Sequence, residues 1–380
     1  MGIPLYPGFA PLSLDMKGEM HPRLSLTTDG VSEFTFSSLY LFRHRYGYRV
    51  SRIGRGGSFV ISGSHPAPPG AAARRFFMTP CEAPERGVLE GLFASHDYWK
   101  NISDAVLEPA RQSLEEWGIC AREDRDNFDY LYARSDLAEL AGKKYHKKRN
   151  LVHQFAGAYS HEQRPLTPET AGAALEILEQ WRQDKSAGTA AAAAGSAGAA
   201  EGEPTPAAAS AAAPSIAGGE IGDYQAAREA LEQLGSLALR GCVWFAGGKP
   251  AGYCLGESVA KGKMFAIHFE KALDRYKGIY QFMNKSFAGA LPRFFAYINR
   301  EQDLGDEGLR QAKMTYRPSG FVRKHVASIP GAAQPAGQPA QTAAQIAGQA
   351  ADQPGQFAAQ SARFAGQPSA AAGRREGGEG

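Results

Sequence analysis

The sequence predicts an α+β fold built from two domains, and three observations lead to this prediction. The second half of the chain reads as three successive strands, one long amphipathic helix and a further strand. The segment around residue 55 reads as a β-hairpin, with a Gly-rich turn between two apolar runs. Apolar patterning covers roughly 290 of the 380 residues, which is enough for two domains of ordinary size.

The 44 glycines and 23 prolines are concentrated in two segments. Residues 185–222 consist mainly of Ala, Gly, Ser and Pro, and residues 329–380 of Ala, Gln, Gly and Pro. Such compositions bury too little apolar surface to offset the entropy lost on folding. We therefore predict a disordered insert and a disordered tail, an N-terminal domain over residues 1–150 and a C-terminal domain over residues 151–328.

In the first half, turn residues bound several short runs with apolar or alternating character. These predicted strands cover residues 48–53, 58–62, 76–80 and 127–133. Helices with one apolar face are predicted from Val88, over residues 102–117 and after the N-cap offered by Ser135 and Asp136. Residues 34–42 are aromatic-rich and fit a buried helix and a strand equally well.

The second half begins with a helix that has Thr167 as its N-cap and Pro168 as its first residue. Another capped helix begins near Asp223, after the insert. The predicted strands are apolar or alternating and cover residues 242–246, 251–257, 264–270, 293–298 and 312–316. The remaining predicted helices cover residues 278–291 and 306–314.

The bulk numbers exclude several classes of protein. A net charge of +3 is too small to attract nucleic acid or membrane through the overall field. The four cysteines are far apart and the histidines lack metal-ligand spacing, so neither a disulfide framework nor a metal site is predicted. We see no signal peptide and no apolar run of about 20 residues. We therefore expect a cytoplasmic protein, with any membrane contact peripheral and on the inner face.

A basic segment holds five Lys or Arg residues between residues 143 and 149. We predict that it forms one side of an amphipathic helix and binds an anionic ligand through charge-assisted hydrogen bonds. A lipid headgroup, a tRNA backbone or a nucleotide would each suit such a site, whereas the plain alternative is a solvated helix face. The candidate ligands are Lys143, Lys144, His146, Lys147, Arg149 and Asn150.

A second candidate site lies where a predicted strand leads into a helix. Strand alternation places His268 and Glu270 on one face, where a carboxylate beside an imidazole can act as general base. Arg275, Lys277 and Gly278 then precede the helix, and a helix N-terminus with nearby cations can bind an anion. The alternatives are a buried structural histidine and a surface turn with an ion pair.

A polar run follows the predicted strand over residues 293–298, at a position where binding groups are common. Its candidate binding residues are Asn299, Arg300, Glu301 and Asp303, and Lys313, Tyr316 and Arg317 would extend the site. The alternative is a capped loop whose polar side chains pair with one another.

These stretches together resemble a known family. The segments Lys143–Asn150, Phe269–Ala272, Tyr276–Gly278 and Tyr297–Gly305 are similar to a bacterial family that is grouped with the C-terminal catalytic domain of phosphatidylglycerol lysyltransferases. The similarity covers about residues 20–327 and is interrupted by the insert. The resemblance implies two tandem acyltransferase-like domains of the GNAT type, similar in plan to the Fem-type aminoacyltransferases, which use aminoacyl-tRNA.

The resemblance also implies where the ligands bind. In GNAT domains the donor's pyrophosphate sits at the turn after the fourth strand, which corresponds here to Arg275, Lys277 and Gly278. This turn has fewer glycines than the usual acyl-CoA loop, so aminoacyl-tRNA is favoured over acyl-CoA as the co-substrate. No tightly bound cofactor is expected. An anionic lipid headgroup or a small-molecule amine would be the acceptor, and the membrane-spanning half of the lysyltransferases has no counterpart in this sequence.

Two functional hypotheses follow. In the first, the protein is an acyltransferase or aminoacyltransferase in which Glu270, with His268, accepts the proton of an attacking amine or hydroxyl. Asn299 and Arg300 would orient the donor or stabilise the developing oxyanion. In the second, the protein is a non-catalytic module that binds RNA or an anionic membrane through the basic segment.

Overall fold

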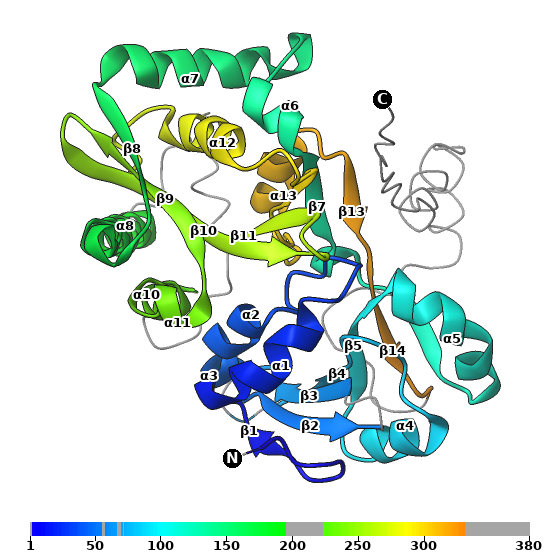
Figure 1. Ribbon diagram of the computed structural model, residues 1–380. Helices are drawn as coiled ribbons and strands as arrows, with labels where there is room; N and C mark the ends of the chain where they lie inside the picture. The colour runs from blue at the N-terminus through cyan, green and yellow to red at the C-terminus, as the bar shows by residue number, and fades with distance from the viewer. Residues whose placement is uncertain (1, 55–57, 67–69, 71, 195–222, 331–380) are drawn as a thin grey trace, which may run out of the picture. The chain divides into compact units, whose positions relative to one another are not determined.

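The computed structural model describes residues 2–54, 58–66, 70, 72–194 and 223–330. Within these ranges the chain forms two mixed β-sheets of seven strands each, with helices packed around them (Figure 1). The insert from residue 195 to 222 and the tail from residue 331 lie outside the described residues. No helix in the described ranges is both long enough and apolar enough to span a lipid bilayer.

The first sheet holds six strands from the first half of the chain and one from its end. In spatial order the strands are β1 (Ala10–Pro11), β2 (Arg49–Ile53), β3 (Ser58–Ser64), β4 (Arg75–Met78), β5 (Tyr98–Ser103), β14 (Lys324–Ser328) and β6 (Cys120–Glu123). Neighbouring strands are antiparallel, except that β4 and β5 are parallel, with Phe76 opposite Tyr98.

The second sheet repeats this plan. In the corresponding order its strands are β8 (His161–Pro165), β9 (Arg240–Ala246), β10 (Lys249–Val259), β11 (Met264–Ala272), β12 (Tyr297–Asn299), β7 (Asp129–Ala133) and β13 (Gly320–Val322). Again only one pair of neighbours, β11 and β12, is parallel. Each parallel pair is joined by a helix, α4 in the first sheet and α12 in the second.

The two sheets exchange their sixth strands. Strand β7 belongs by sequence to the first half, yet it lies between β12 and β13 in the second sheet. Strand β14 comes from the end of the described chain and lies between β5 and β6 in the first sheet. Figure 1 shows this by colour, since the orange β14 lies beside the cyan β5. The two sheets therefore do not divide the chain at a single point.

Twelve α-helices of the described chain connect or cover the strands. They are α1 (Lys17–Leu24), α2 (Phe36–Leu41), α3 (Arg43–Tyr46), α4 (Arg86–Phe93), α5 (Asp104–Glu116), α6 (Arg134–Glu139), α7 (His146–Ala158), α8 (Pro168–Ala194), α10 (Tyr224–Glu232), α11 (Leu234–Leu237), α12 (Ile279–Ala290) and α13 (Glu307–Met314). Short 3-10 helices cover Leu14–Met16, Arg125–Asn127 and Lys143–Tyr145.

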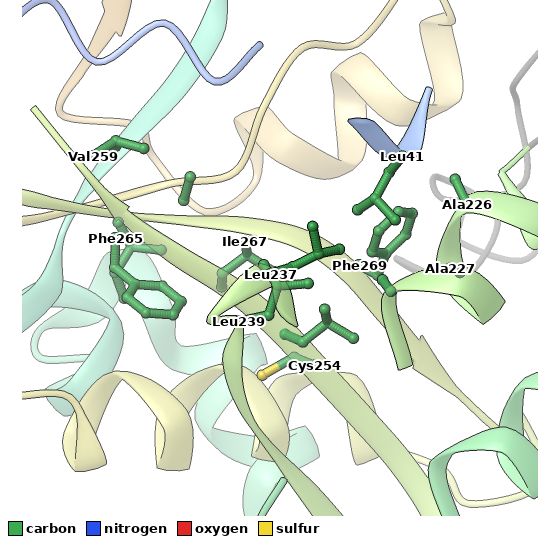
Figure 2. Close-up of a cluster of buried hydrophobic side chains, with 14 of the residues drawn as sticks. Leu41, Ala226, Ala227, Leu237, Leu239, Cys254, Val259, Phe265, Ile267 and Phe269 are labelled. Carbon is green, nitrogen blue, oxygen red and sulfur yellow. The ribbon is translucent and has the colours of Figure 1, made fainter. Parts of the chain in front are cut away.

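An apolar cluster fixes strand β11, which carries the candidate catalytic residues. Figure 2 shows Phe269 of β11 beside Leu41 of α2, in one apolar cluster with Ile267 of the same strand and Ala227 of α10, and all four side chains are buried. Burying a side chain as large as Ile, Leu or Phe contributes about 1.5–3 kcal/mol. The opposite face of β11 is therefore held in a defined position relative to α12 and the loop that follows β12.

The α+β fold class predicted from the sequence is confirmed, together with the hairpin β2–β3 and the successive strands β9, β10 and β11. The sequence pattern of residues 34–42 was compatible with either a helix or a strand, and in the structure these residues contain helix α2. Thr35 is the N-cap of α2 and accepts a hydrogen bond from the Ser38 amide. Helix α8 begins at Pro168 as predicted, and it continues to Ala194 through the first residues of the predicted insert.

Three predicted elements are wrong. Strand β12 is limited to Tyr297–Asn299 instead of residues 293–298, because it pairs with only three residues of β11. Residues 312–314 end helix α13 rather than starting a strand, and the closing strands lie at 320–322 and 324–328. Asp136 does not cap α6, which begins at Arg134; its carboxylate instead binds Lys144.

Candidate active site

A cavity of about 220 Å³ is lined by residues of both sheets. The first sheet and the helices beside it contribute Glu33, Arg45, Tyr46, Tyr48 and Lys100. The second sheet and its loops contribute Asp223, His268, Glu270, Arg300, Glu301, Lys313 and Tyr316. The cavity therefore holds acids, cations and aromatic rings in a partly buried space, where electrostatic interactions are stronger than in water.

The geometry of β11 and β12 brings Glu270 into this cavity. The two strands pair only over Met264–Ala266 of β11, which then continues to Ala272 paired with β10 but not with β12. The separation leaves the side chain of Glu270, which is 10% exposed, facing the loop after β12. There Nη2 of Arg300 donates to Oε2 of Glu270 at 3.1 Å, and Nδ2 of Asn284 donates to Oε1 at 2.9 Å. The carboxylate is thus oriented from two sides.

His268 has a part different from the one suggested by its spacing from Glu270. Its Nδ1 is 2.8 Å from Oε1 of Glu301 and its Nε2 is 3.1 Å from Oε1 of Glu257. Burial alone would lower its pKa, but the hydrogen bonds and charges of Glu257 and Glu301 raise the pKa of His268 to about 10. An imidazolium at neutral pH cannot accept a proton, so His268 serves as a buried cation that joins β10 to the loop after β12.

The charge of His268 predicts a pH-dependent stability. Because its pKa rises from 6.5 to about 10 on folding, its stabilisation is complete below about pH 6.5 and is lost as the pH rises to about 10. We expect the difference in unfolding free energy between wild type and His268→Gln to shrink by about 1.4 kcal/mol per pH unit in that window. Urea denaturation at several pH values measures this. The exposed His153→Gln is the control for the substitution itself and should cost little stability. A difference for His268→Gln that does not change with pH would contradict the assignment.

The polar run after β12 is mostly a scaffold. Asn299 is fully buried, donates to the Gly30 carbonyl at 2.9 Å and accepts from the Glu301 amide at 2.7 Å. Asp303 is also fully buried; it accepts from Tyr130 at 2.5 Å and forms two bonds of 2.9 Å with Arg310. These bonds fix the loop, while Arg300, Glu301, Gln302 and Leu304 of the run line the cavity.

Lys313 closes this loop from α13. Its Nζ donates to the backbone oxygens of Arg300 at 2.8 Å, Glu301 at 3.1 Å and Gln302 at 2.5 Å. Burial lowers the pKa of Lys313 to about 7, although these carbonyl oxygens are well placed for an ammonium. Lys313 therefore positions Arg300 by binding the backbone oxygen of Arg300.

The turn before α12 lies away from the cavity. Arg275 and Lys277 are exposed, and neither they nor Gly278 lines the cavity. Gly278 has φ +87°, and a Cβ atom there would lie 2.2 Å from the carbonyl oxygen of Leu151 in α7. Glycine is thus required for close packing of α12 on α7, and the structure does not bring this turn together with Glu270.

The basic segment is split between two helices. Lys143 and Lys144 lie in a 3-10 turn, whereas His146, Lys147, Arg149 and Asn150 belong to α7. Lys144 pairs with Asp136 at 2.9 Å, and Arg149 donates to the carbonyl oxygens of Leu140 and Gly142. Lys143, His146, Lys147 and Asn150 are exposed. None of the six predicted ligands lines the cavity, so this segment forms a separate surface.

The sequence analysis missed a buried ion-pair cluster beside the cavity, of which only Glu33 lines it, and it also missed two residues of α3 that line it. Lys324 is fully buried and binds Oε2 of Glu33 at 2.5 Å and Oδ1 of Asp129 at 2.7 Å. Burial raises the pKa of Asp129 to about 6 against the opposing effect of Lys324. Arg45 and Tyr46 also line the cavity, and the alternating basic and aromatic residues 43–49 were the signal that could have revealed them.

The described ranges contain no group of three or more His, Cys, Asp or Glu side chains arranged to hold a metal ion. A carboxylate at the open end of a parallel strand pair, an arginine beside it and a cavity large enough for a reacting group are the parts of a group-transfer site.

The repeated sheets define the class of the protein, which is an α+β fold with two mixed seven-stranded sheets of the same strand plan. The family model for the C-terminal region of phosphatidylglycerol lysyltransferase matches residues 25–328. The chain therefore belongs to this family, and its kind of function is acyl or aminoacyl transfer. None of the curated proteins compared with the chain matches it.

Solved structures with a similar fold include a conserved protein of unknown function from Bacteroides thetaiotaomicron. It has a TM-score of 0.67 and 25% identity, and the match covers 84% of this chain and 99% of that one. The C-terminal domain of a putative lysylphosphatidylglycerol synthetase from Agrobacterium fabrum has a TM-score of 0.49 and 14% identity, over 84% and 93% of the two chains. L-PGS from Bacillus licheniformis has a TM-score of 0.44 and 11% identity, over 76% and 86%.

Proposed function

We propose that the protein transfers an aminoacyl group from aminoacyl-tRNA to an amine or hydroxyl on a second substrate, with Glu270 as the proton acceptor. The observation that carries this proposal is the Glu270–Arg300 pair at the point where β11 separates from β12. An oriented carboxylate with a cation beside it, facing a cavity, suits both proton removal and stabilisation of negative charge.

In the proposed step, the acceptor's nitrogen or oxygen attacks the carbonyl carbon of the donor ester. The proton of the acceptor passes to Glu270, and the negative charge that develops on the carbonyl oxygen faces Arg300. Collapse of this intermediate breaks the bond to the ribose oxygen, which takes up a proton and leaves as the free hydroxyl of tRNA. With an acyl-CoA donor the same step would release a thiol, so the protein groups do not by themselves distinguish the donors.

The basic segment is proposed to bind an anionic part of a substrate. The exposed residues Lys143, His146, Lys147 and Asn150 form a surface outside the cavity that suits the tRNA backbone or an anionic lipid headgroup. A tRNA donor requires a cationic surface beyond the reacting end, because most of the tRNA stays outside a cavity of about 220 Å³. The basic segment is the surface that we assign to this contact.

A donor screen tests the proposal. Purified protein is incubated with charged tRNAs or with acyl-CoAs, together with amine, hydroxyl and anionic phospholipid acceptors, and products are identified by mass spectrometry. We expect transfer from at least one charged tRNA, with activity that falls as salt rises, because phosphate contacts release counterions. Replacing Lys143 and Lys147 with Ala should reduce this salt dependence, whereas Lys249→Ala, at the exposed first residue of β10, should not.

The alternative is a non-catalytic module that binds RNA or membrane. It is supported by the separation of the basic segment from the cavity, because such a surface could bind an anionic partner without any reaction in the cavity. If no donor is consumed under any condition, yet tRNA or anionic vesicles bind and the Lys143, Lys147 double variant abolishes this binding, the alternative replaces the enzymatic proposal. If transfer occurs only from acyl-CoA, the choice of donor is wrong but the acyltransferase remains.

A further inference from the structure

The edge of the second sheet that lies away from Glu270 exposes an apolar loop. Strands β11 and β12 are parallel, with Met264 opposite Tyr297, so their N-terminal ends lie together at this edge. The loop of residues 290–296 leads into β12 here, and four of its residues are apolar and exposed, namely Ala290, Pro292, Phe294 and Ala296. Phe294 is 67% exposed, the highest value among the large hydrophobic residues that the structure describes.

The loop is held in this conformation by its neighbours. The amide of Ala296 donates to the carbonyl oxygen of Lys263 at 2.9 Å, which ties the loop to the turn before β11. Phe295 is buried, with its ring centroid 5.5 Å from that of Phe265. Because Phe295 occupies the buried position, the ring of Phe294 stays in solvent, where an apolar ring gains nothing. The exposed ring is therefore a fixed feature of this edge.

Three cations adjoin the loop. Arg293 belongs to it, and Lys261 and Lys263 belong to the turn between β10 and β11. All three are exposed, and within the described ranges none of them forms an ion pair with a carboxylate. Neither residues 258–269 nor residues 284–300, which contain the turn and the loop, include an Asp or a Glu. The edge is therefore locally cationic, although the net charge of the whole chain is only +3.

This combination favours one kind of partner. Apolar side chains on a loop with cations around them suit the interface of an anionic bilayer, where the ring enters the headgroup region and the cations contact lipid phosphates. A single-stranded nucleic acid also uses rings and cations. However, the loop exposes one ring only, and Ala290, Pro292 and Ala296 offer no surface on which bases stack.

We infer that the loop of residues 290–296 and the turn of residues 260–263, here called the docking edge, bind the protein to an anionic lipid bilayer. Lys263 precedes Glu270 by seven residues, or about 20 Å along the strand, so the docking edge attaches the protein and does not hold a substrate at the cavity. It contains none of the residues of the basic segment. The inference does not rest on the proposed function, because attachment needs no group transfer.

Vesicle flotation tests the inference. The protein is mixed with vesicles of phosphatidylcholine alone or of equal parts phosphatidylcholine and phosphatidylserine, and the bound fraction is measured as lipid is increased. We expect binding to the anionic vesicles only. Replacing both Lys261 and Lys263 with Gln should weaken it roughly 25-fold, because each cation near an anionic surface strengthens binding about fivefold. Phe294→Ser should weaken it about tenfold, because a ring buried in the interface is lost.

Matched controls separate this edge from the rest of the surface. Replacing both Lys249 and Lys277 with Gln removes two exposed cations at the opposite edge of the same sheet, and Leu5→Ser removes an apolar side chain that is 63% exposed. Both controls should bind vesicles as wild type does. In Phe294→Trp, the emission of the added indole should shift to shorter wavelength with anionic vesicles, which reports entry of this side chain into the bilayer.

Several outcomes would overturn the inference. They are equal binding to both kinds of vesicle, no binding to either, and unchanged binding in the docking-edge variants that thermal unfolding shows to be folded. Loss of vesicle binding only when Lys143 and Lys147 become Ala would assign the membrane to the basic segment instead. If the docking-edge variants lose affinity for tRNA and not for vesicles, the edge is a nucleic-acid surface and the inference is wrong.

The outcomes also separate this inference from the proposed function. Vesicle binding that depends on Lys261, Lys263 and Phe294, without transfer from any donor, would support the docking edge and refute the transferase. Transfer by a protein that does not bind anionic vesicles would refute the docking edge and support the transferase.

Discussion

Replacing Glu270 with Gln is expected to lower the rate of group transfer by about 100- to 10,000-fold, the range typical of a lost general base. The substitution keeps the shape of the side chain and one oxygen, which can accept from either Asn284 or Arg300, whereas its NH2 group cannot accept from the other donor. It removes the basicity that the transfer step needs. The measurement is kcat under saturating concentrations of both substrates, with the donor found in the screen.

The control for this prediction is Glu162→Gln, which changes an exposed carboxylate on β8 that pairs with Arg164 at 2.7 Å. That variant should keep its kcat within about twofold, because exposed ion pairs contribute little. A Glu270→Gln protein that unfolds at the wild-type temperature and retains more than about a tenth of the activity would show that Glu270 is not the proton acceptor.

Lys324→Met is expected to reduce the free energy of unfolding by about 3–5 kcal/mol. Lys324 and Asp129 are both fully buried, and Glu33 is 15% exposed, so the variant leaves two buried carboxylates without their cation. The loss should be smaller at acidic pH, because protonation of Asp129 or Glu33 then removes the unpaired charge. Urea denaturation of the variant and the wild type at pH 5 and pH 7.5 measures both effects.

The neighbouring residue provides a matched control. Arg323 is 47% exposed and pairs with Glu123 at the surface, so Arg323→Met should cost less than about 1 kcal/mol. Equal losses for Lys324→Met and Arg323→Met would mean that the buried ion pairs contribute no more than a surface pair. If Lys324→Met loses the same unfolding free energy at both pH values, the unpaired carboxylates of Asp129 and Glu33 are not the cause of the loss.

Local signals account for the parts of the fold that were predicted. Strands β9–β11 and helix α12 carry apolar residues at the spacing of their own structure, so the pattern suffices. Strand β14 was not found, because the side chain of Lys324 points into the protein toward Asp129 and disguises a buried strand as a polar segment. The charge of Lys324 is balanced by Asp129, which is 195 residues away in sequence, so no local pattern could reveal the pair.

The residues of the candidate site divide in the same way, into those that local sequence signals identified correctly and those whose role depends on distant partners. Glu270 and Arg300 were selected because each sits where a strand ends, and the structure brings these two together. Asn299 and Asp303 were selected for the same reason, yet both are buried in hydrogen bonds that shape the loop. Lys100 was missed because its place beside the cavity depends on how the first sheet faces the second. Hydrogen-bonding capacity is visible in a sequence, but whether a partner already satisfies it is not.

The exchange of β7 and β14 has a consequence for how the chain is made. Strand β14 is synthesised roughly 200 residues after β6, the strand it must pair with, so the first sheet stays incomplete throughout that interval. Until then the edges of β5 and β6 are open to pairing with other chains. The N-terminal half therefore cannot reach its native state during synthesis as an independent unit. Because its contact order is high and its strand edges stay exposed, we expect this architecture to fold slowly and to need chaperones.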